Sequence, residues 1–290
     1  MPETNTLFSA EPAVMEPSRR AAFARLEAFV PKAGRQYASG RNTDRGAGAH
    51  TSVSLLSPYL RHRLVLEQEV LAAVRAKHSV QGAEKFISEV FWRTYFKGFL
   101  ERRPTIWSSY QTDLESQRNA ARRDNALAAD LADAEAGRTG IDAFDHWANE
   151  LVDTGYLHNH ARMWFASIWI FTLGLPWQWG ADFFLRHLLD GDPASNTLSW
   201  RWVGGLHTKG KTYLARPDNI ARYTEGRFSP KNLAREAPAL VEDEVHDLLP
   251  PPAPTVTPRE DVLLLLTEED CAPETLKLTA KGILATNTTA

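Results

Sequence analysis

The sequence predicts an all-α body followed by a short acidic extension. Apolar residues recur at helical spacing between Gly and Pro stops, and no alternating strand pattern occurs before residue 210. After residue 250 the composition changes, because PPPAPTVTP is typical of a linker and DVLLLLTEED of one buried strand. We expect disorder at 1–17, a helical domain at 18–230, and an extension at 231–290 with a linker at 250–258.

Capping residues and stops set approximate helix bounds. Ser18 is an N-cap type, and the helix after it should end before Pro31. Ser57 followed by Pro58 predicts a second start, and a longer helix from about Ala83 to Arg102 must stop before Pro104. We further expect a loop at 34–50, a charged surface helix at 109–135, and helices at roughly 142–153, 157–173, 180–189 and 193–203, with stops at Gly155, Gly174 and Gly204.

Charge and composition exclude several classes of protein. The net charge is −3, but residues 231–290 carry 5 basic and 11 acidic residues, which leaves 28 basic and 25 acidic residues for 1–230. A mildly basic body permits a groove for nucleic acid without requiring one. Cys271 is the single cysteine, so an internal disulfide or a cysteine-held metal cluster is excluded. The absence of a long apolar stretch predicts a cytoplasmic protein without membrane contact.

Common catalytic motifs are missing as well. The chain has no phosphate-binding GxxxxGK[ST] loop, no GxGxxG turn, no HExxH pair and no GxSxG elbow. His158 and His160 are two residues apart, so on a helix their side chains would diverge instead of sharing a metal. We therefore expect no zinc site.

Three segments combine residues that core packing alone does not require. DGDPASNTLSWRW (190–202) places two acids, an Asn and two Trp within about four helical turns. TGYLHNHARMWFAS (154–167) and SEVFWRTYFKGF (88–99) precede it. Together they resemble the FAD-binding helical domain of the photolyase and cryptochrome family over roughly residues 35–230. The resemblance implies a photolyase-type helical fold and FAD as cofactor.

The resemblance assigns one set of residues to the cofactor. Ser54, Leu56 and Ser57 resemble a TSxLSP segment that holds the FAD pyrophosphate, with Val53 in place of its Thr. Asn196 stands where the family faces the flavin N5 atom, and a buried Arg162–Asp190 pair should lie beside the flavin. The implied cofactor-binding residues are Ser54, Leu56, Ser57, Arg93, Asn159, Arg162, Asp190, Asp192 and Asn196.

A second set is implied for damaged DNA. Glu89 should hydrogen-bond a flipped pyrimidine dimer, Trp92 and Trp202 should form the cavity walls, and Asn159 and Met163 should position the dimer. Relatives that repair (6-4) photoproducts place His at both of the last two positions, which argues against that chemistry here. A surface ion pair between Glu89 and Arg93, four residues apart, is the simpler alternative for those two.

Trp200 and Trp177 stand where the family keeps the inner and middle members of its electron-transfer chain. The alternative for both is core packing. The outer Trp is missing, so Trp107, Trp147 or Trp179 would have to substitute. Basic residues beyond Trp202 alternate with Tyr213 and Tyr223, which suits either a phosphate grip or a solvated loop; they are Lys209, Lys211, Arg216, Arg222 and Arg227.

These residues support three alternative functions. The first is a deoxyribodipyrimidine photolyase-like lyase that repairs pyrimidine dimers in single- or double-stranded DNA. The second is a cryptochrome-like blue-light photoreceptor that signals through the acidic extension without repair. The third is a light-independent FAD-binding relative. Barely thirty-five residues precede the resemblance, so no antenna domain and no second chromophore are expected.

Overall fold

A computed structural model describes residues 15–251, 253, 262–276 and 279–286. Within these residues the chain forms twelve α-helices and one two-stranded sheet, so the predicted all-α body is confirmed. The disorder predicted at 1–17 and the linker predicted at 250–258 fall mostly outside the described residues.

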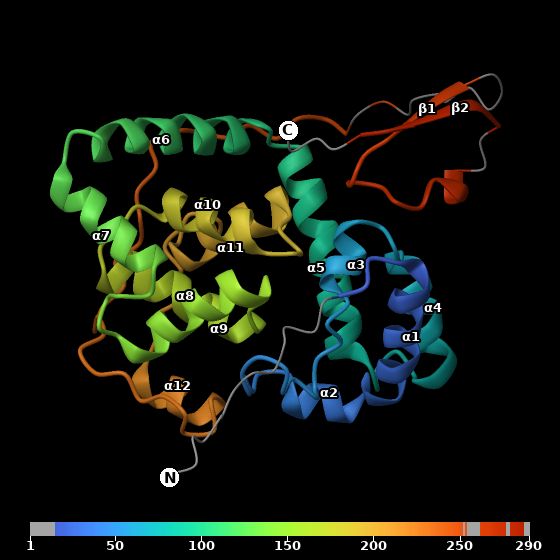
Figure 1. The fold of residues 1–290 in the computed structure, drawn as a ribbon, viewed down its shortest axis with the longest axis horizontal. Coiled ribbons are helices and arrows are strands. Elements are labelled where there is room, and N and C mark those ends of the chain that lie inside the picture. Colours follow the sequence, from blue (N-terminus) through green and yellow to red (C-terminus); the bar gives the residue numbers. More distant parts are fainter. Residues whose placement is uncertain (1–14, 252, 254–261, 277–278, 287–290) are drawn as a thin grey trace, which may run out of the picture.

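The helices before residue 102 form a first lobe with its own apolar core. Figure 1 shows α1, α3 and α4 on one side of α5, which runs along the middle of the molecule. Leu26, Tyr59, Val74 and Phe86 belong to this core, and all are buried. The helices of the first lobe are α1 (Arg19–Phe29), α2 (Arg35–Gly40), α3 (Ser57–Arg61), α4 (Glu67–Lys77) and α5 (Glu84–Glu101).

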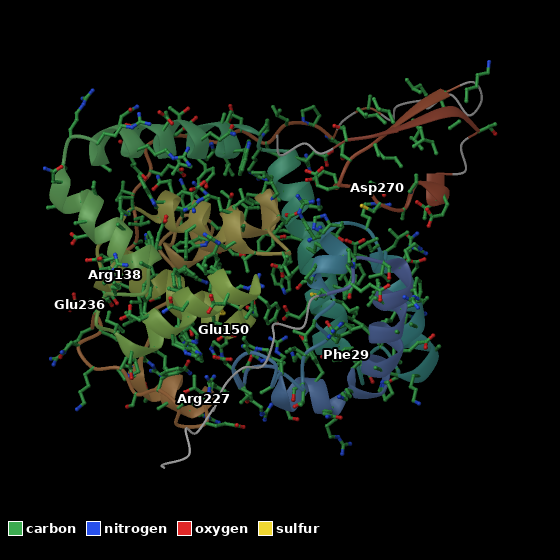
Figure 2. All side chains as sticks on the ribbon, in the orientation of Figure 1. Phe29, Arg138, Glu150, Arg227, Glu236 and Asp270 are labelled. Carbon is green, nitrogen blue, oxygen red and sulfur yellow. The ribbon has the colours of Figure 1, made fainter. Side chains whose placement is uncertain are left out.

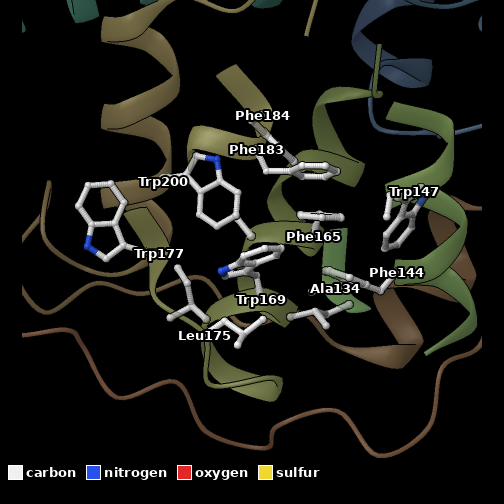
Figure 3. Close-up of a cluster of buried hydrophobic side chains, with 14 of the residues drawn as sticks. Ala134, Phe144, Trp147, Phe165, Trp169, Leu175, Trp177, Phe183, Phe184 and Trp200 are labelled. Atoms are coloured by element: carbon white, nitrogen blue, oxygen red, sulfur yellow. The ribbon is translucent and has the colours of Figure 1, made fainter. Parts of the chain in front are cut away.

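The remaining helices form a second lobe around a separate aromatic core. Phe165 stacks on Phe144 at 4.2 Å between ring centroids, and Trp169 and Trp200 meet edge to face at 6.2 Å (Figure 3). The helices of the second lobe are α6 (Thr105–Ala121), α7 (Asn125–Glu135), α8 (Asp142–Thr154), α9 (Asn159–Ser167), α10 (Trp177–His187), α11 (Pro193–Val203) and α12 (Pro217–Tyr223). The two apolar cores are separate, and ion pairs such as those of Asp192 with Arg93 and Lys97 connect the lobes.

Several predicted helix ends are confirmed. The Ser18 hydroxyl accepts a hydrogen bond from the Ala21 N–H at 3.1 Å, which caps α1. Gly155 and Gly174 have φ of 67° and 65°, the left-handed conformation that ends a helix. Gly204 ends α11 in a right-handed conformation instead, and Gly205 takes the positive φ of 81°.

Other sequence predictions are wrong in detail. The loop predicted at 34–50 contains α2, and the single helix predicted at 109–135 is two helices, because the Asp124 carboxylate caps a new start at the Ala126 and Leu127 N–H groups. Nor is that segment all surface, since Tyr110 on α6 is buried. Ser57 is the first residue of α3 and makes no capping hydrogen bond. The helix predicted at 157–173 is α9 followed by a π-helical turn at Ile168–Thr172, and α10 begins three residues before its predicted start.

The C-terminal extension contains two parallel strands where one buried strand was predicted. They are β1 (Val262–Leu266) and β2 (Ala280–Ala285), and Leu263 and Leu265 of β1 are 75% and 58% exposed. The segment after β1 docks on the first lobe, where Glu269 pairs with Arg61 and Asp270 pairs with Arg63 at 3.0 Å. Figure 2 shows Asp270 between the sheet and this lobe.

An extended segment before the sheet covers the second lobe. Glu242 makes two hydrogen bonds of 2.6 Å with the Arg201 guanidinium, and the Leu240 N–H donates to the Gly204 carbonyl at 2.9 Å. Arg201 is buried and lies over the Trp177 ring at 6.0 Å. Among the helices that the structure describes, none is long and apolar enough to span a membrane.

Gly180 allows α10 to approach the indole of Trp200. A Cβ atom at this position would lie 2.4 Å from the Trp200 Cη2 atom and 3.0 Å from the Trp169 Cδ2 atom. Both rings are buried in the second core and have no free space into which to shift.

Replacing Gly180 with Ala should therefore destabilise the protein by about 1–3 kcal/mol, the usual result of overpacking a core. Gly98 on α5 is the matched control, since nothing lies within 4 Å of its added Cβ and Ala is the better helix former. Urea unfolding of both variants measures this. Equal stability of Gly180→Ala and the unaltered chain would show that the contact is unimportant.

Candidate functional site

The carboxylate of Asp192 joins the two lobes. It caps α11 by accepting the Ser195 N–H at 2.8 Å, and it pairs with Arg93 at 3.4 Å and Lys97 at 3.1 Å on α5. Its side chain is 1% exposed. Burial alone would raise the pKa of this carboxyl, but the Arg93 charge, the Ser195 N–H and Lys97 outweigh burial and lower the pKa. Asp192 is therefore ionised at neutral pH.

Arg162 and Asp190 form the expected bidentate pair. Both N–H···O distances are 3.0 Å, and the Arg162 Nε–H also donates to the Leu157 carbonyl at 2.9 Å. Burial opposes the charge on Arg162, but Asp190 raises the pKa of Arg162 overall, so the guanidinium stays charged. Asn196, six residues after Asp190, is buried, and its side-chain amide donates to the Ala181 carbonyl at 2.7 Å. This hydrogen bond leaves its carbonyl oxygen as the end that can face a ligand.

A group of buried titratable residues lies where the loop after α2 meets the second lobe. His50 stacks on His158 with ring centroids 5.3 Å apart, and its Nε2 lies 4.0 Å from a Glu150 carboxylate oxygen. Asp44 accepts a hydrogen bond from the Trp147 indole at 3.2 Å. Burial, followed by repulsion from His50, lowers the pKa of His158 to about 3, so His158 is neutral at physiological pH. Sequence patterns do not reveal the role of His50, because its contacts with Glu150 and His158 join residues at least 100 positions apart. Glu150 also pairs with His146, four residues before it, at 3.3 Å.

Some buried polar atoms in this cluster and on α11 have no hydrogen-bond partner among the described residues. Such atoms are rare in folded proteins, and they mark places where a water or ligand completes the structure. They include both ring nitrogens of His50, His158 Nε2, Thr197 Oγ1 and Trp200 Nε1.

The residues predicted to hold the pyrophosphate lie in the turn before α3 and have different local roles. The Ser54 hydroxyl accepts the Leu56 N–H at 3.3 Å, which shapes the turn before α3. Leu55 in that turn has a φ of 53°, an uncommon conformation for a residue with a side chain. Leu56 is 1% exposed and belongs to the first core, so its side chain is structural, and its carbonyl accepts the Leu60 N–H at 2.9 Å.

The residues predicted for the DNA site are more exposed. Glu89 does not pair with Arg93; it pairs with Arg41, the residue that follows α2, which rules out the simple i,i+4 alternative. Trp92 is 50% exposed, Asn159 is exposed at the start of α9, and Met163 is half-buried. Trp202 is half-buried and stacks on Tyr213 at 5.8 Å.

Two of the basic residues predicted to bind phosphates after Trp202 form ion pairs within the protein. Arg227 pairs with Asp44 at 3.0 Å, and Arg216 pairs with Asp218 at 3.4 Å. Lys209 and Lys211 are exposed in the turn that follows α11.

The tryptophans predicted for electron transfer lie on neighbouring helices, Trp177 on α10 and Trp200 on α11, and both are buried (Figure 3). The Trp177 ring is 5.7 Å from Tyr110, and Tyr110 is 5.1 Å from Trp107. Trp147 instead stacks on Trp164, and Trp179 hydrogen-bonds Glu135 at 2.8 Å. Of the three substitutes for the outer Trp, Trp107 is thus the one linked to Trp177 by ring contacts that the structure describes.

Comparison with known proteins agrees with this geometry. Residues 86–229 match the family model described as the FAD binding domain of DNA photolyase. The chain belongs to the photolyase and cryptochrome family. It is 34% identical over 199 residues to the deoxyribodipyrimidine photo-lyase of Thermus thermophilus, covering 69% of this chain and 45% of that protein. It is 33% identical over 185 residues to the enzyme of the same name from Streptomyces griseus, covering 59% and 39%.

Solved structures show the same fold. A class III photolyase from Agrobacterium tumefaciens matches with a TM-score of 0.58 at 24% identity, covering 72% of this chain and 43% of the other. A cryptochrome from Synechocystis matches with a TM-score of 0.59 at 23% identity, covering 77% and 46%. The chain spans less than half the length of these photolyases and of the curated relatives it matches.

FAD is the cofactor of this photolyase-family domain, and the residues present fit it. The bidentate Arg162–Asp190 pair and the Asn196 carbonyl are polar groups of the kind that could contact a flavin ring. Buried polar atoms without a hydrogen-bond partner among the described residues occur in both lobes, for example at Arg93 Nε in the first and at His158 Nε2 and Thr197 Oγ1 in the second, and a polar ligand could satisfy them.

Replacing His158 with Asn should make stability less dependent on pH. An unfolded His binds a proton below about pH 6.5, whereas folded His158 stays neutral down to about pH 3, so the folded state loses stability as pH falls through this window. Asn removes that titration and is a good capping residue for α9.

The slope of the unfolding free energy between pH 7 and pH 5, measured by urea unfolding, should fall by up to about 1.4 kcal/mol per pH unit in the variant. His158 carries no charge over this range, so its replacement removes no charge that acts on His50 or His160, and the difference between the two proteins reports mainly the titration of His158 in the unfolded state. Identical slopes would show that His158 is not held neutral by the fold.

Proposed function

We propose that this chain is a photolyase-like flavoprotein that repairs cyclobutane pyrimidine dimers in DNA by light-driven electron transfer. When bound, reduced FAD supplies the electron after it absorbs light. The observation that carries the proposal is the part-buried, bidentate pair between Arg162 on α9 and Asp190, which lies on the same segment as Asp192 and Asn196. The photo-lyase names of the relatives support the same reaction.

The role of this chain is to bind, orient and tune charge. With FAD bound, the Arg162 guanidinium would supply fixed positive charge to the ring that gains electrons, and Asp190 holds the orientation of the guanidinium. Asn196 has no readily transferable proton, which favours the fully reduced cofactor. Asn159 and Met163, at positions where (6-4) relatives carry His, favour the cyclobutane dimer as substrate.

Damaged DNA is the proposed partner, with the dimer flipped out between Trp92 and Trp202. Extraction of a damaged base costs less than extraction of a paired one. Trp92 is 50% exposed and Trp202 is half-buried, so both retain ring surface for a ligand. The repair reaction takes place on nucleic acid, and we place the protein in the cytoplasm.

The direct test uses oligothymidylate irradiated to form dimers. With FAD-loaded protein and blue light, thymine absorbance should recover, and in the dark it should not. A protein that binds FAD but never restores this absorbance would be a photoreceptor or a light-independent relative.

Replacing Glu89 with Gln should slow repair while dimer binding is retained. The carboxylate is half-exposed and held by Arg41, where it can accept a hydrogen bond from the dimer and stabilise its added charge. Arg41→Gln is the control, because it breaks the same ion pair but keeps the carboxylate. Single-turnover recovery of thymine absorbance on saturated protein separates the two. If Glu89→Gln repairs as fast as the unaltered chain, Glu89 has no such role.

We further propose that Trp107 is the outer electron donor of this chain. An electron would move inward from Trp107 to Trp177 and then to Trp200, and a thiol in solution would refill Trp107 through the cleft of about 620 Å³ that this residue lines. Burial raises the pKa of Tyr110, whose hydroxyl has no hydrogen-bond partner among the described residues. Oxidised Tyr must lose that proton, so Tyr110 bridges the two indoles without being oxidised itself.

Photoreduction of the bound flavin in blue light with a thiol should therefore slow several-fold in Trp107→Phe. Trp179→Phe is the matched control, since Trp179 also lies half-buried on the same lobe but is tied to Glu135. Bleaching of the visible flavin band gives the rate. Equal loss in both variants would point to a general effect on folding or cofactor binding.

A further inference from the structure

The second half of α5 exposes a row of aromatic rings that neither core uses. Trp92 and Tyr95 are 50% and 45% exposed, and their centroids are 5.4 Å apart. Tyr95 contacts Phe99 at 5.8 Å, and Trp92 contacts Phe96 at 5.9 Å. His207, from the turn after α11, lies 4.6 Å from Phe99 and reaches the Tyr95 hydroxyl with its Nε2 at 3.4 Å. We call Trp92, Tyr95, Phe96, Phe99 and His207 the aromatic ladder.

Helical spacing explains why these rings form a continuous strip. Residues 92, 95, 96 and 99 recur at three- and four-residue intervals, which places their side chains on one face of α5. Seven residues of helix rise about 10 Å, close to the height of about three stacked bases at 3.4 Å each. A soluble surface rarely shows contiguous aromatic rings unless they bind something.

Cations lie beside the Phe99 and His207 end of the ladder. The Arg103 guanidinium lies over one face of the Phe99 ring, 4.1 Å from its centroid. Lys209 and Lys211 are exposed in the turn that carries His207. Aromatic faces beside a basic edge suit single-stranded nucleic acid, because bases stack on the rings while the cations meet phosphates. A duplex cannot use the strip, since its bases are already stacked on one another.

We propose that the aromatic ladder is a stacking platform for unpaired DNA bases next to the dimer, with Arg103, Lys209 and Lys211 bound to the phosphates. The platform begins at Trp92, one wall of the proposed dimer cavity, so it continues that site along the strand. Single-stranded or locally melted DNA is then the preferred substrate. This inference rests on the proposed function for its biological meaning, but its binding step needs neither light nor repair.

The test compares three undamaged ligands in the dark by fluorescence anisotropy: a short labelled oligothymidylate, a strand of equal length with abasic sites, and a hairpin duplex. The abasic strand has the same phosphates but no bases. Stacking predicts at least about tenfold tighter binding of oligothymidylate than of the abasic strand, given about 1–3 kcal/mol per stacked base. Equal affinity for both strands would overturn the proposal.

Variants assign the effect to the ladder. Tyr95→Ala and Phe99→Ala should each weaken oligothymidylate binding about tenfold while the salt dependence of binding stays the same, since phosphate contacts remain. Tyr95→Phe keeps the ring and should bind like the unaltered chain. Phe91→Ala is the matched control, because Phe91 is 55% exposed on the same helix but makes none of the ladder contacts.

The possible results distinguish failure of the stacking platform from failure of the proposed repair activity. If Phe91→Ala loses as much affinity as Tyr95→Ala, the effect is general surface apolarity and the platform is wrong. If the base-dependent binding is present but irradiated oligothymidylate is never repaired, the platform stands and the proposed activity fails. Circular dichroism and thermal melting confirm that each variant is folded.

Discussion

The buried carboxylate of Asp192 is the constraint on which the arrangement of the site depends. Removing a carboxylate from water is costly, and only charged or hydrogen-bonded partners offset that cost. Here Arg93 and Lys97 come from the first lobe, while the capped N–H of Ser195 comes from the second. The same residue therefore starts α11, attaches it to α5 and fixes the relative position of the two lobes.

Fixing α11 in this way also positions the remaining candidate site residues. Asp190 lies two residues before the cap and Asn196 lies in the first turn after it, so neither can move independently of Asp192. The Arg61 Nε–H donates to the Gly191 carbonyl at 2.6 Å, a second link from the first lobe to the same turn. Charge near a flavin is useful only when it does not reorganise during the reaction, and this turn is held from both sides.

The sequence predicts local features better than it predicts contacts between lobes. Ser18, Gly155 and Gly174 could be assigned because a cap or a left-handed stop depends on neighbouring residues. The pairing of Arg162 with Asp190 was accessible through the family resemblance. The Glu89–Arg41 pair was not, because a loop was expected where α2 and Arg41 lie, and Arg41 is 48 positions away from Glu89.

The errors near residue 124 and in β2 have a related physical cause. Asp124 looks like one more charge in a polar helix, and only its capping hydrogen bonds show that it starts α7. In β2, the segment AKGILA is too short and too mixed in character to show a strand period alone. It pairs in parallel with β1, and a parallel partner across a 13-residue connection leaves no hairpin turn to find.

The acidic extension bears on the choice between repair and signalling. A signalling tail must leave the body when the cofactor changes state, but here Glu242 and Glu269 each hold an arginine that is buried. Breaking one such pair leaves an uncompensated buried charge, which costs about 3–5 kcal/mol in typical proteins. Releasing the extension would require both ion pairs to break. That costs more free energy than a few altered contacts around the flavin would provide. The extension is therefore better understood as part of the closure of the helical domain, which favours a rigid repair site over a light-driven switch.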